Sequence, residues 1–145
     1  MRSNQHNCRF AENMDAKEKI LITGATGHAG REVVSSLISL GKESLITVTS
    51  RDPEKAKKSQ GNQEMKHLDF QKPETFAPAV SGCSSIFLMR PPAISNTKDT
   101  LNVLIDDARK EGVNHIVFLS VAGAADNKLV PHHAVEQHLM NGPND

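Results

Sequence analysis

The stretch ILITGATGHAG, residues 20–30, decides the fold of this 145-residue chain. It opens on an apolar run, residues 20–23, that is rich in β-branched side chains and shows no polar alternation. Such a run is typical of a strand covered on both faces, as in a parallel sheet. After the glycines, apolar residues recur at helical spacing at Val33, Val34, Leu37 and Ile38. The stretch therefore predicts a strand, a glycine-rich turn and a helix.

Each glycine of this turn has a physical task. Gly24 permits the tight turn out of the strand, Gly27 lets a pyrophosphate approach the backbone, and Gly30 permits close packing of the helix on the sheet. The N–H groups of the first helical turn, at the positive end of the helix dipole, then hold the phosphates. The alternative is a glycine-rich turn with no binding function. The predicted dinucleotide contacts in the turn are Gly24, Ala25, Thr26, Gly27, His28, Ala29 and Gly30.

Four further apolar runs predict strands, and helical patterns lie between them. The strands are expected at residues 45–49, 65–68, 86–89 and 116–119. Helices are expected from the Asp52-Pro53 cap, over residues 101–112 and over residues 134–140, with a poor helix at 73–81 that contains Pro78. Strands that alternate with helices imply right-handed crossovers. The predicted fold class is α/β: a Rossmann-type, doubly wound parallel sheet with strand order 3-2-1-4-5.

Composition bounds the functions open to the chain. Lys and Arg together number 17, as do Asp and Glu, so the net charge is zero and no footprint for nucleic acid or an anionic membrane is expected. Cys8 and Cys83 lie far apart and favour reduced thiols in a cytoplasmic protein. No run is long and apolar enough for a membrane span. Residues 1–18 are expected to be a disordered tail, with Met14 as an alternative start, and residues 19–145 a single domain.

The chain resembles the NmrA-like family of atypical short-chain dehydrogenases/reductases. This family includes NAD(P)H:quinone oxidoreductases, azoreductase-like proteins and regulators that sense NADP(H). The glycine spacing G-x-x-G-x-x-G indicates the superfamily, and the later segments narrow it to the family. The resemblance runs from Lys19 to about Pro143 and rests on residues 20–30, 50–53 with Lys55 and Lys57, 68–69, 117–123 and 132–139.

The tip of the second strand favours NADP(H) over NAD(H). An acidic residue there would accept hydrogen bonds from the ribose 2′-hydroxyl, whereas an arginine binds a 2′-phosphate. Arg51 stands at this tip, and Lys55 follows one helical turn later. The adjacent Asp52 is explained as a helix cap. The alternative for Arg51 is a solvated surface side chain.

Short-chain reductases normally use a tyrosine as proton donor with a lysine four residues later. The sequence contains no tyrosine, which excludes that mechanism within this chain, and no catalytic residue is assigned. By the family resemblance His132 takes the place of the lysine and lies near the nicotinamide ribose; the alternative is a partly exposed histidine at a helix start. His132 and Glu136 share a helical face near His133 and His138, but no third ligand at metal-site spacing appears, so no metal is predicted.

Further cofactor contacts are expected after the third and fourth strands. Asp69 and Phe70 resemble the adenine-contacting pair of the family, although an aspartate that ends a strand is also an ordinary turn residue. Met89, Arg90 and Pro91 lie where a nicotinamide would sit, and Arg90 either touches phosphate or covers the sheet end. Ser120, after the fifth strand, faces the same crevice or simply begins a loop.

Three functional hypotheses follow. The first is the NADP(H)-binding domain of an oxidoreductase whose relatives transfer hydride to quinone- or azo-type acceptors. The second is a non-enzymatic NADP(H) sensor that acts on a regulatory protein partner, and the third is an inactive fragment. Members of the family continue into a smaller lobe that closes the substrate pocket, and this lobe is expected to be missing here. The uncovered strand at residues 116–119 is then expected to favour self-association.

Overall fold

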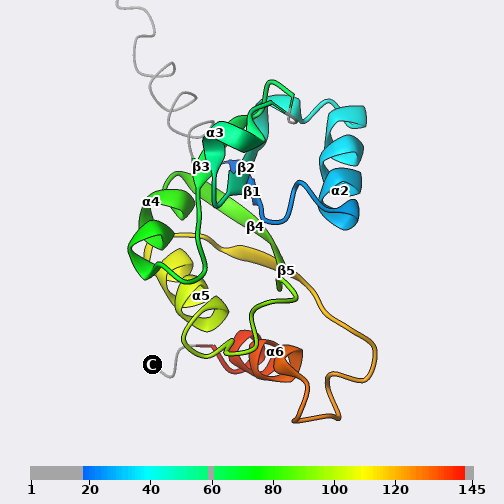
Figure 1. The fold of residues 1–145 in the computed structure, drawn as a ribbon, viewed down its shortest axis with the longest axis vertical. Helices are drawn as coiled ribbons and strands as arrows, with labels where there is room; N and C mark the ends of the chain where they lie inside the picture. The colour runs from blue at the N-terminus through cyan, green and yellow to red at the C-terminus, as the bar shows by residue number, and fades with distance from the viewer. Residues whose placement is uncertain (1–17, 59–60, 143–145) are drawn as a thin grey trace, which may run out of the picture.

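The computed structural model describes residues 18–58 and 61–142 (Figure 1). The tail expected over residues 1–18, like the choice between Met1 and Met14, therefore falls outside the described residues except for Glu18. In the part of the chain that the structure describes, no helix is long and apolar enough to cross a membrane.

A five-stranded parallel sheet forms the centre of the fold, in the order β3-β2-β1-β4-β5. This order confirms the predicted doubly wound, Rossmann-type sheet. Every observed strand bound lies within three residues of the predicted one. The largest difference is at β4, which begins three residues before its predicted start because Cys83 already pairs with Lys19 of β1. The strands are β1 (Lys19–Ile22), β2 (Ile46–Ser50), β3 (Glu64–His67), β4 (Cys83–Met89) and β5 (His115–Leu119).

Helices cover both faces of the sheet, and Figure 1 shows α2 on the opposite side from α4 and α5. On one face, Val34 of α2 packs with Ile22 and Val48. On the other, α4, α5 and α6 close a larger core that contains Leu104 and Val135. The helices are α2 (His28–Ser39), α3 (Pro53–Ala56), α4 (Phe76–Val80), α5 (Leu101–Lys110) and α6 (Pro131–Asn141), with 3₁₀ turns η1 (Glu43–Leu45) and η2 (Pro73–Thr75).

Local sequence signals explain where these helices begin and end. Asp52 caps α3 by accepting a hydrogen bond from the Lys55 N–H at 3.2 Å, with Pro53 at the first helical position, as predicted. The weak helix expected over residues 73–81 divides into η2 and α4. Proline is tolerated in the first turn of an α-helix but not in its interior, so Pro78 fits a short helix that begins at Phe76 and not one that begins at residue 73. The last helix starts at Pro131 rather than at 134, because proline suits a first helical position.

The outer edge of β5 has no partner strand among residues 18–58 and 61–142. Val117 and Leu119 on this strand are 47% and 43% exposed, whereas the alternate residues Ile116 and Phe118 pack against the larger core. An apolar edge of this kind is a template for pairing with another chain. The expectation of self-association through this strand stays a prediction.

Candidate functional site

The carboxyl ends of β1, β2, β4 and β5 meet at one edge of the sheet and carry most of the predicted contacts. The chain leaves β1 toward β2 and returns from β3 to β4, so the strand order reverses between β1 and β4. Ligands of open α/β sheets bind at such a switch point. The glycine turn lies directly above it, between β1 and α2.

The backbone of the glycine turn requires glycine at two positions. Gly24 has φ of +67°, a left-handed conformation that side chains rarely adopt. A Cβ on Gly30 would lie 2.1 Å from the carbonyl oxygen of Gly24, so only glycine allows α2 to begin so close to β1. Both tasks assigned from the sequence agree with this geometry.

Gly27 differs from its two neighbours because its surroundings are open. A Cβ there would meet only the Gly24 oxygen, at 3.4 Å, and no other atom within 4 Å. Gly27 is the N-cap of α2, and no side chain caps the helix. The N–H groups of His28, Ala29 and Gly30 have no acceptor among the residues that the structure describes. These donors, at the positive end of the helix, form a cradle for an anion.

Thr23 joins the two halves of the sheet at the switch point. Its hydroxyl donates to the carbonyl oxygen of Phe87 at 3.1 Å and accepts from the N–H of Met89 at 2.9 Å. Thr23 is 1% exposed, and no separate role for it was predicted from the sequence. The feature of the sequence that could have indicated this role is a hydroxyl residue at the end of an otherwise apolar run.

At the tip of β2, the adjacent residues Arg51 and Asp52 differ in whether their side chains have partners. Arg51 is exposed, and its guanidinium has no hydrogen bond or ion pair to any described residue. Asp52 is engaged twice by Lys55, through the cap and through an ion pair at 3.5 Å. The Ser50 hydroxyl accepts from the Asp52 N–H at 3.1 Å. Among these residues, the arginine is therefore the group left to meet a ligand.

Asp69 and Phe70 are both occupied within the fold. The Asp69 carboxylate accepts from the Gln71 N–H at 3.0 Å, which is a turn typical of aspartate. Phe70 is 8% exposed, and its ring packs edge-on against that of Phe76, with ring centroids 6.4 Å apart. Any adenine contact from Phe70 would therefore come from its backbone.

Met89, Arg90 and Pro91 follow β4 and lie beside the glycine turn. The Met89 sulfur lies 3.3 Å from the position of a Cβ on Gly24, so its side chain covers the start of the turn. The Arg90 guanidinium turns away onto the loop that follows β4. There its Nη1 donates to the carbonyl oxygens of Pro91 at 3.2 Å and of Pro92 at 3.3 Å, and to that of Ile94. Arg90 therefore fixes this loop.

His132 is 8% exposed, which corrects the alternative of a partly exposed histidine. Its Nε2 accepts from Arg90 Nε at 3.4 Å, and its ring lies 5.8 Å from that of Phe118. The neutral ring then carries its proton on Nδ1, which is buried and has no hydrogen-bond partner among the described residues. Burial, and then the Arg90 charge, lower the pKa of His132, while Glu136 opposes them. His132 is thus a neutral donor with an unfilled hydrogen bond.

The remaining polar residues near His132 hold the fold together. The Ser120 hydroxyl donates to the Glu136 carboxylate, which ties the end of β5 to α6. His138 contacts Asp106 of α5 instead of His132. In the described part of the chain, no group of three or more His, Cys, Asp or Glu side chains has the arrangement of a metal site. Burial raises the pKa of the Cys83 thiol, which lies at the opposite end of β4.

Comparison with known proteins identifies a family. Residues 24–142 match the model of a family described as NAD(P)H-binding. Prestalk A differentiation protein A of Dictyostelium discoideum is 32% identical over 126 residues, which are 86% of this chain and 41% of that protein. An uncharacterised oxidoreductase of Bacillus subtilis is 25% identical over 79% of this chain and 38% of its own length. The chain thus spans about two fifths of these relatives.

Solved structures agree with the sequence matches. Triphenylmethane reductase of Citrobacter sp., solved with NADP(H), superposes with a TM-score of 0.75 at 29% identity, over 85% of this chain and 45% of that one. An NADPH-dependent quinone oxidoreductase of Escherichia coli, solved with NADPH, gives a TM-score of 0.74 at 27% identity, over 84% of this chain and 44% of that one.

The lowered pKa of His132 predicts that acid destabilises the protein. The unfolded chain binds the proton more tightly, so stability falls as the pH drops below about 6.5 and levels off below the folded-state pKa. This residue contributes a slope of at most about 1.4 kcal/mol per pH unit. Urea unfolding of the wild type and of His132→Gln between pH 5 and 8 measures it. The variant should lose this slope, whereas the exposed His115→Gln should keep it. An unchanged slope in His132→Gln would contradict the assignment.

Proposed function

The chain belongs to the NAD(P)H-binding family, and from that premise we propose that it binds NADP(H) in preference to NAD(H). Its structural neighbours are reductases of the NmrA-like, atypical short-chain type, as the sequence resemblance predicted. We further propose that it serves as the cofactor domain of an oxidoreductase that transfers hydride to quinone- or azo-type acceptors. Residues 19–145 would form this domain.

The glycine cradle carries this proposal. An uncapped helix, three N–H groups without acceptors and open space at Gly27 fit a pyrophosphate. A dinucleotide there would receive hydrogen bonds from residues 28–30, while Gly24, Ala25 and Thr26 line the turn. At the adenine end, Asp69 and the backbone of Phe70 would complete the site.

Arg51 supports the choice of NADP(H). A 2′-phosphate carries about two negative charges near neutral pH and suits a planar guanidinium. Arg51 is free to meet it, while the nearest carboxylate, on Asp52, is already committed to Lys55. The proposed preference for NADP(H) therefore rests on the unpaired guanidinium of Arg51 and on the Asp52 carboxylate, which already binds Lys55.

His132 would stand at the nicotinamide end, with Met89, Arg90 and Pro91. Its unpartnered Nδ1–H suits a ribose hydroxyl or a carboxamide oxygen, and its contact with Arg90 fixes the ring orientation. NADPH, when bound, supplies the hydride. The chain contains no tyrosine to act as proton donor, so the proposed acceptors are ones that take a hydride without such a residue.

The absence of a tyrosine also favours a second candidate, a non-enzymatic protein that senses NADP(H) and acts on a regulatory partner. Steady-state NADPH oxidation with a panel of quinones and azo dyes separates the two, with the Escherichia coli quinone oxidoreductase as positive control. Turnover supports the oxidoreductase. NADPH binding without turnover supports the sensor, and failure to bind NADPH identifies an inactive fragment.

The cradle predicts the effect of a side chain at Gly27. Gly27→Val should abolish NADPH binding, because the added atoms fill the pyrophosphate position, while far-UV circular dichroism stays near wild type. Isothermal titration calorimetry gives the affinity. A matched Ser35→Val variant adds a similar side chain at an exposed position of α2 and should still bind. Retained binding in Gly27→Val would remove the basis of the proposal.

A charge reversal at Arg51 should affect the affinities for NADPH and NADH differently. Arg51→Asp should weaken NADPH binding by about 1–3 kcal/mol, the range of charge-assisted hydrogen bonds, and leave NADH binding almost unchanged. Calorimetry with both cofactors measures the difference. Lys42→Asp, an equal charge reversal at an exposed lysine after α2, is the control. Equal losses for both cofactors would show that Arg51 does not contact the 2′-phosphate.

A further inference from the structure

One side-chain contact joins α6 to the loop of residues 90–94, which follows β4. His132 lies in the first turn of α6, Arg90 opens the loop, and Arg90 Nε donates to His132 Nε2 at 3.4 Å. A ring nitrogen accepts a hydrogen bond only while it carries no proton. A proton on Nε2 would therefore set two N–H groups against each other and end the contact.

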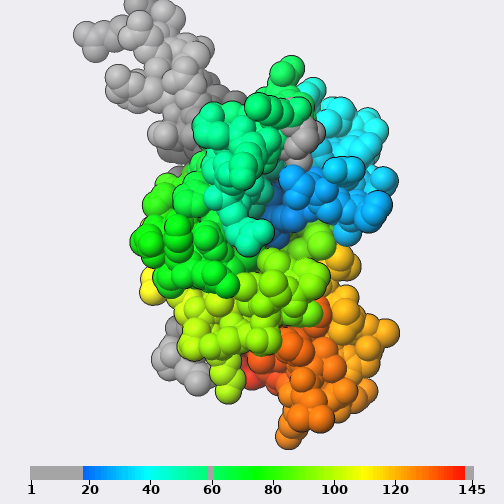
Figure 2. Space-filling view, viewed as in Figure 1, coloured from blue at the N-terminus to red at the C-terminus, as the bar shows by residue number. Residues whose placement is uncertain are grey.

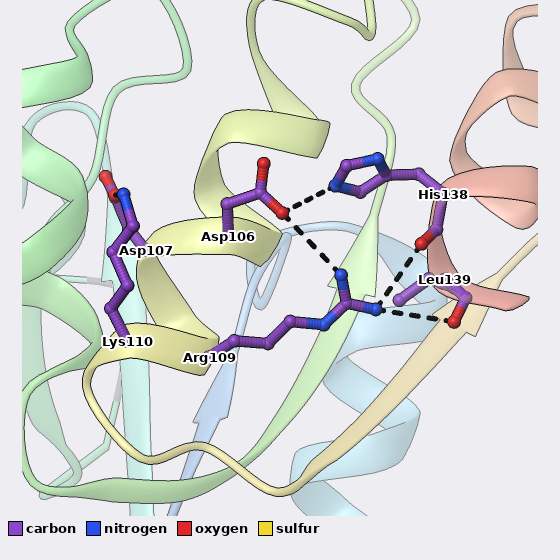
Figure 3. Close-up of polar contacts among 6 residues, drawn as sticks. All are labelled: Asp106, Asp107, Arg109, Lys110, His138 and Leu139. Carbon is purple, nitrogen blue, oxygen red and sulfur yellow. Dashed lines mark hydrogen bonds and ion pairs between the residues drawn. The ribbon is translucent and has the colours of Figure 1, made fainter. Parts of the chain in front are cut away.

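The α6 side of this contact is firmly held. Val135 is fully buried in the core beneath the helix, and a set of polar contacts joins α6 to α5 (Figure 3). The Asp106 carboxylate lies 2.7 Å from His138 Nε2 and 3.6 Å from Arg109 Nη1. Arg109 Nη2 donates to the carbonyl oxygens of His138 and Leu139 at 3.4 and 3.3 Å. A proton on His138 would turn its contact with Asp106 into an ion pair, so these contacts also hold α6 in acid.

On the other side of the contact, Arg90 fastens the loop. Its Nη1 donates to the carbonyl oxygens of Pro91 at 3.2 Å and of Pro92 at 3.3 Å, and to that of Ile94. Ile94 is buried in the core and anchors the far end, whereas Pro92 and Ala93 are exposed. Figure 2 shows the segment that follows β4, yellow-green, at the surface beside the orange and red of α6. The course of the loop between β4 and Ile94 therefore follows the position of one guanidinium group.

A protonated His132 ring has no acceptor where it lies. Its Nδ1 is buried and has no hydrogen-bond partner among the described residues, and its Nε2 would face the N–H of Arg90. The ring of Phe118, 5.8 Å away, carries no charge. Burial, and then the positive charge of Arg90, accordingly lower the pKa of His132. Once the ring is protonated, either the ring or the guanidinium group must move.

Glu136 gives the protonated ring a second position. It lies one helical turn after His132 on α6, and its negative charge opposes the effect of Arg90 on the pKa of His132. Its carboxylate accepts from the hydroxyl of Ser120, at the end of β5. Arg90 and Glu136 are the charged groups that act on the imidazole, and they belong to different segments. A neutral ring suits Arg90, whereas a protonated ring is drawn to Glu136.

We propose that protonation of His132 releases the loop of residues 90–94 and thereby weakens the binding of NADP(H). This regulation rests on the proposed function, because Met89, Arg90 and Pro91 would line the nicotinamide end of that site. When Arg90 leaves the ring, Met89 loses its fixed position over the start of the glycine turn. If only the form with a neutral ring binds tightly, the affinity falls by up to about tenfold per pH unit below the pKa of His132.

The release of the loop is tested in the free chain, without cofactor, by ¹⁵N NMR between pH 8 and 5. The amide signals of Ala93 and Ile94 should shift with the same midpoint as the ring of His132. His132→Gln should abolish these shifts, because its amide oxygen still accepts from Arg90 but does not titrate. The exposed His115→Gln should titrate like the wild type. Loop amides that do not follow the ring of His132 would overturn the proposal.

Glu136→Gln provides a second variant, which keeps the buried imidazole. It removes the acceptor of the protonated ring, so the midpoint of the loop amides should move to lower pH. An unchanged midpoint would show that Glu136 does not receive the ring and would contradict the two-position mechanism.

The effect on the cofactor is measured by calorimetry with NADP⁺, which is stable in acid, at pH 7.5 and 5.5. The ratio of the two affinities should be several-fold larger in the wild type than in His132→Gln. The 2′-phosphate also titrates near pH 6, but it contributes equally to both proteins. Equal ratios would overturn the proposed regulation. Absence of NADP⁺ binding at pH 7.5 would instead contradict the proposed function itself, and the free-chain titration distinguishes that result from failure of the loop release.

Discussion

The structure depends on the close approach of Gly30 to the carbonyl group of Gly24. A single Cβ at Gly30 would lie 2.1 Å from that oxygen, a distance that real side-chain atoms essentially never show. The contact lets α2 begin directly above the end of β1. The same placement lets Val34 reach the core beside Ile22 and turns the first N–H groups of α2 toward open space at Gly27. The packing of α2 on the sheet and the candidate anion cradle thus both depend on the glycine at position 30.

A chain of contacts extends from this point to α6. Thr23 bonds to β4 on both sides of Leu88, which brings Met89 over the glycine turn. Arg90 then contacts His132 and fixes the loop after β4. The contacts place the cradle, that loop and the buried imidazole along one edge of the sheet. This arrangement brings together the residues of the proposed cofactor site.

The sequence allowed the sheet order, the glycine turn and the Asp52 cap to be predicted, because these features depend on short-range patterns. Strand runs, glycine spacing and an aspartate before proline act locally, and the fold confirmed them. Side-chain directions in loops depend on distant partners. Nothing near Arg90 in the sequence indicates that it turns onto loop carbonyls, and nothing near His132 indicates its burial.

The most direct test of the central claim is amide hydrogen exchange, followed by ¹⁵N NMR with and without NADPH. We expect the cofactor to slow exchange most at residues 28–30, whose N–H groups have no acceptor among the described residues. Amides in the outer turns of α5, distant from the turn in the fold, should be unaffected and serve as an internal reference. NADPH that binds without protecting residues 28–30 would contradict the assignment of the glycine turn as the cofactor site.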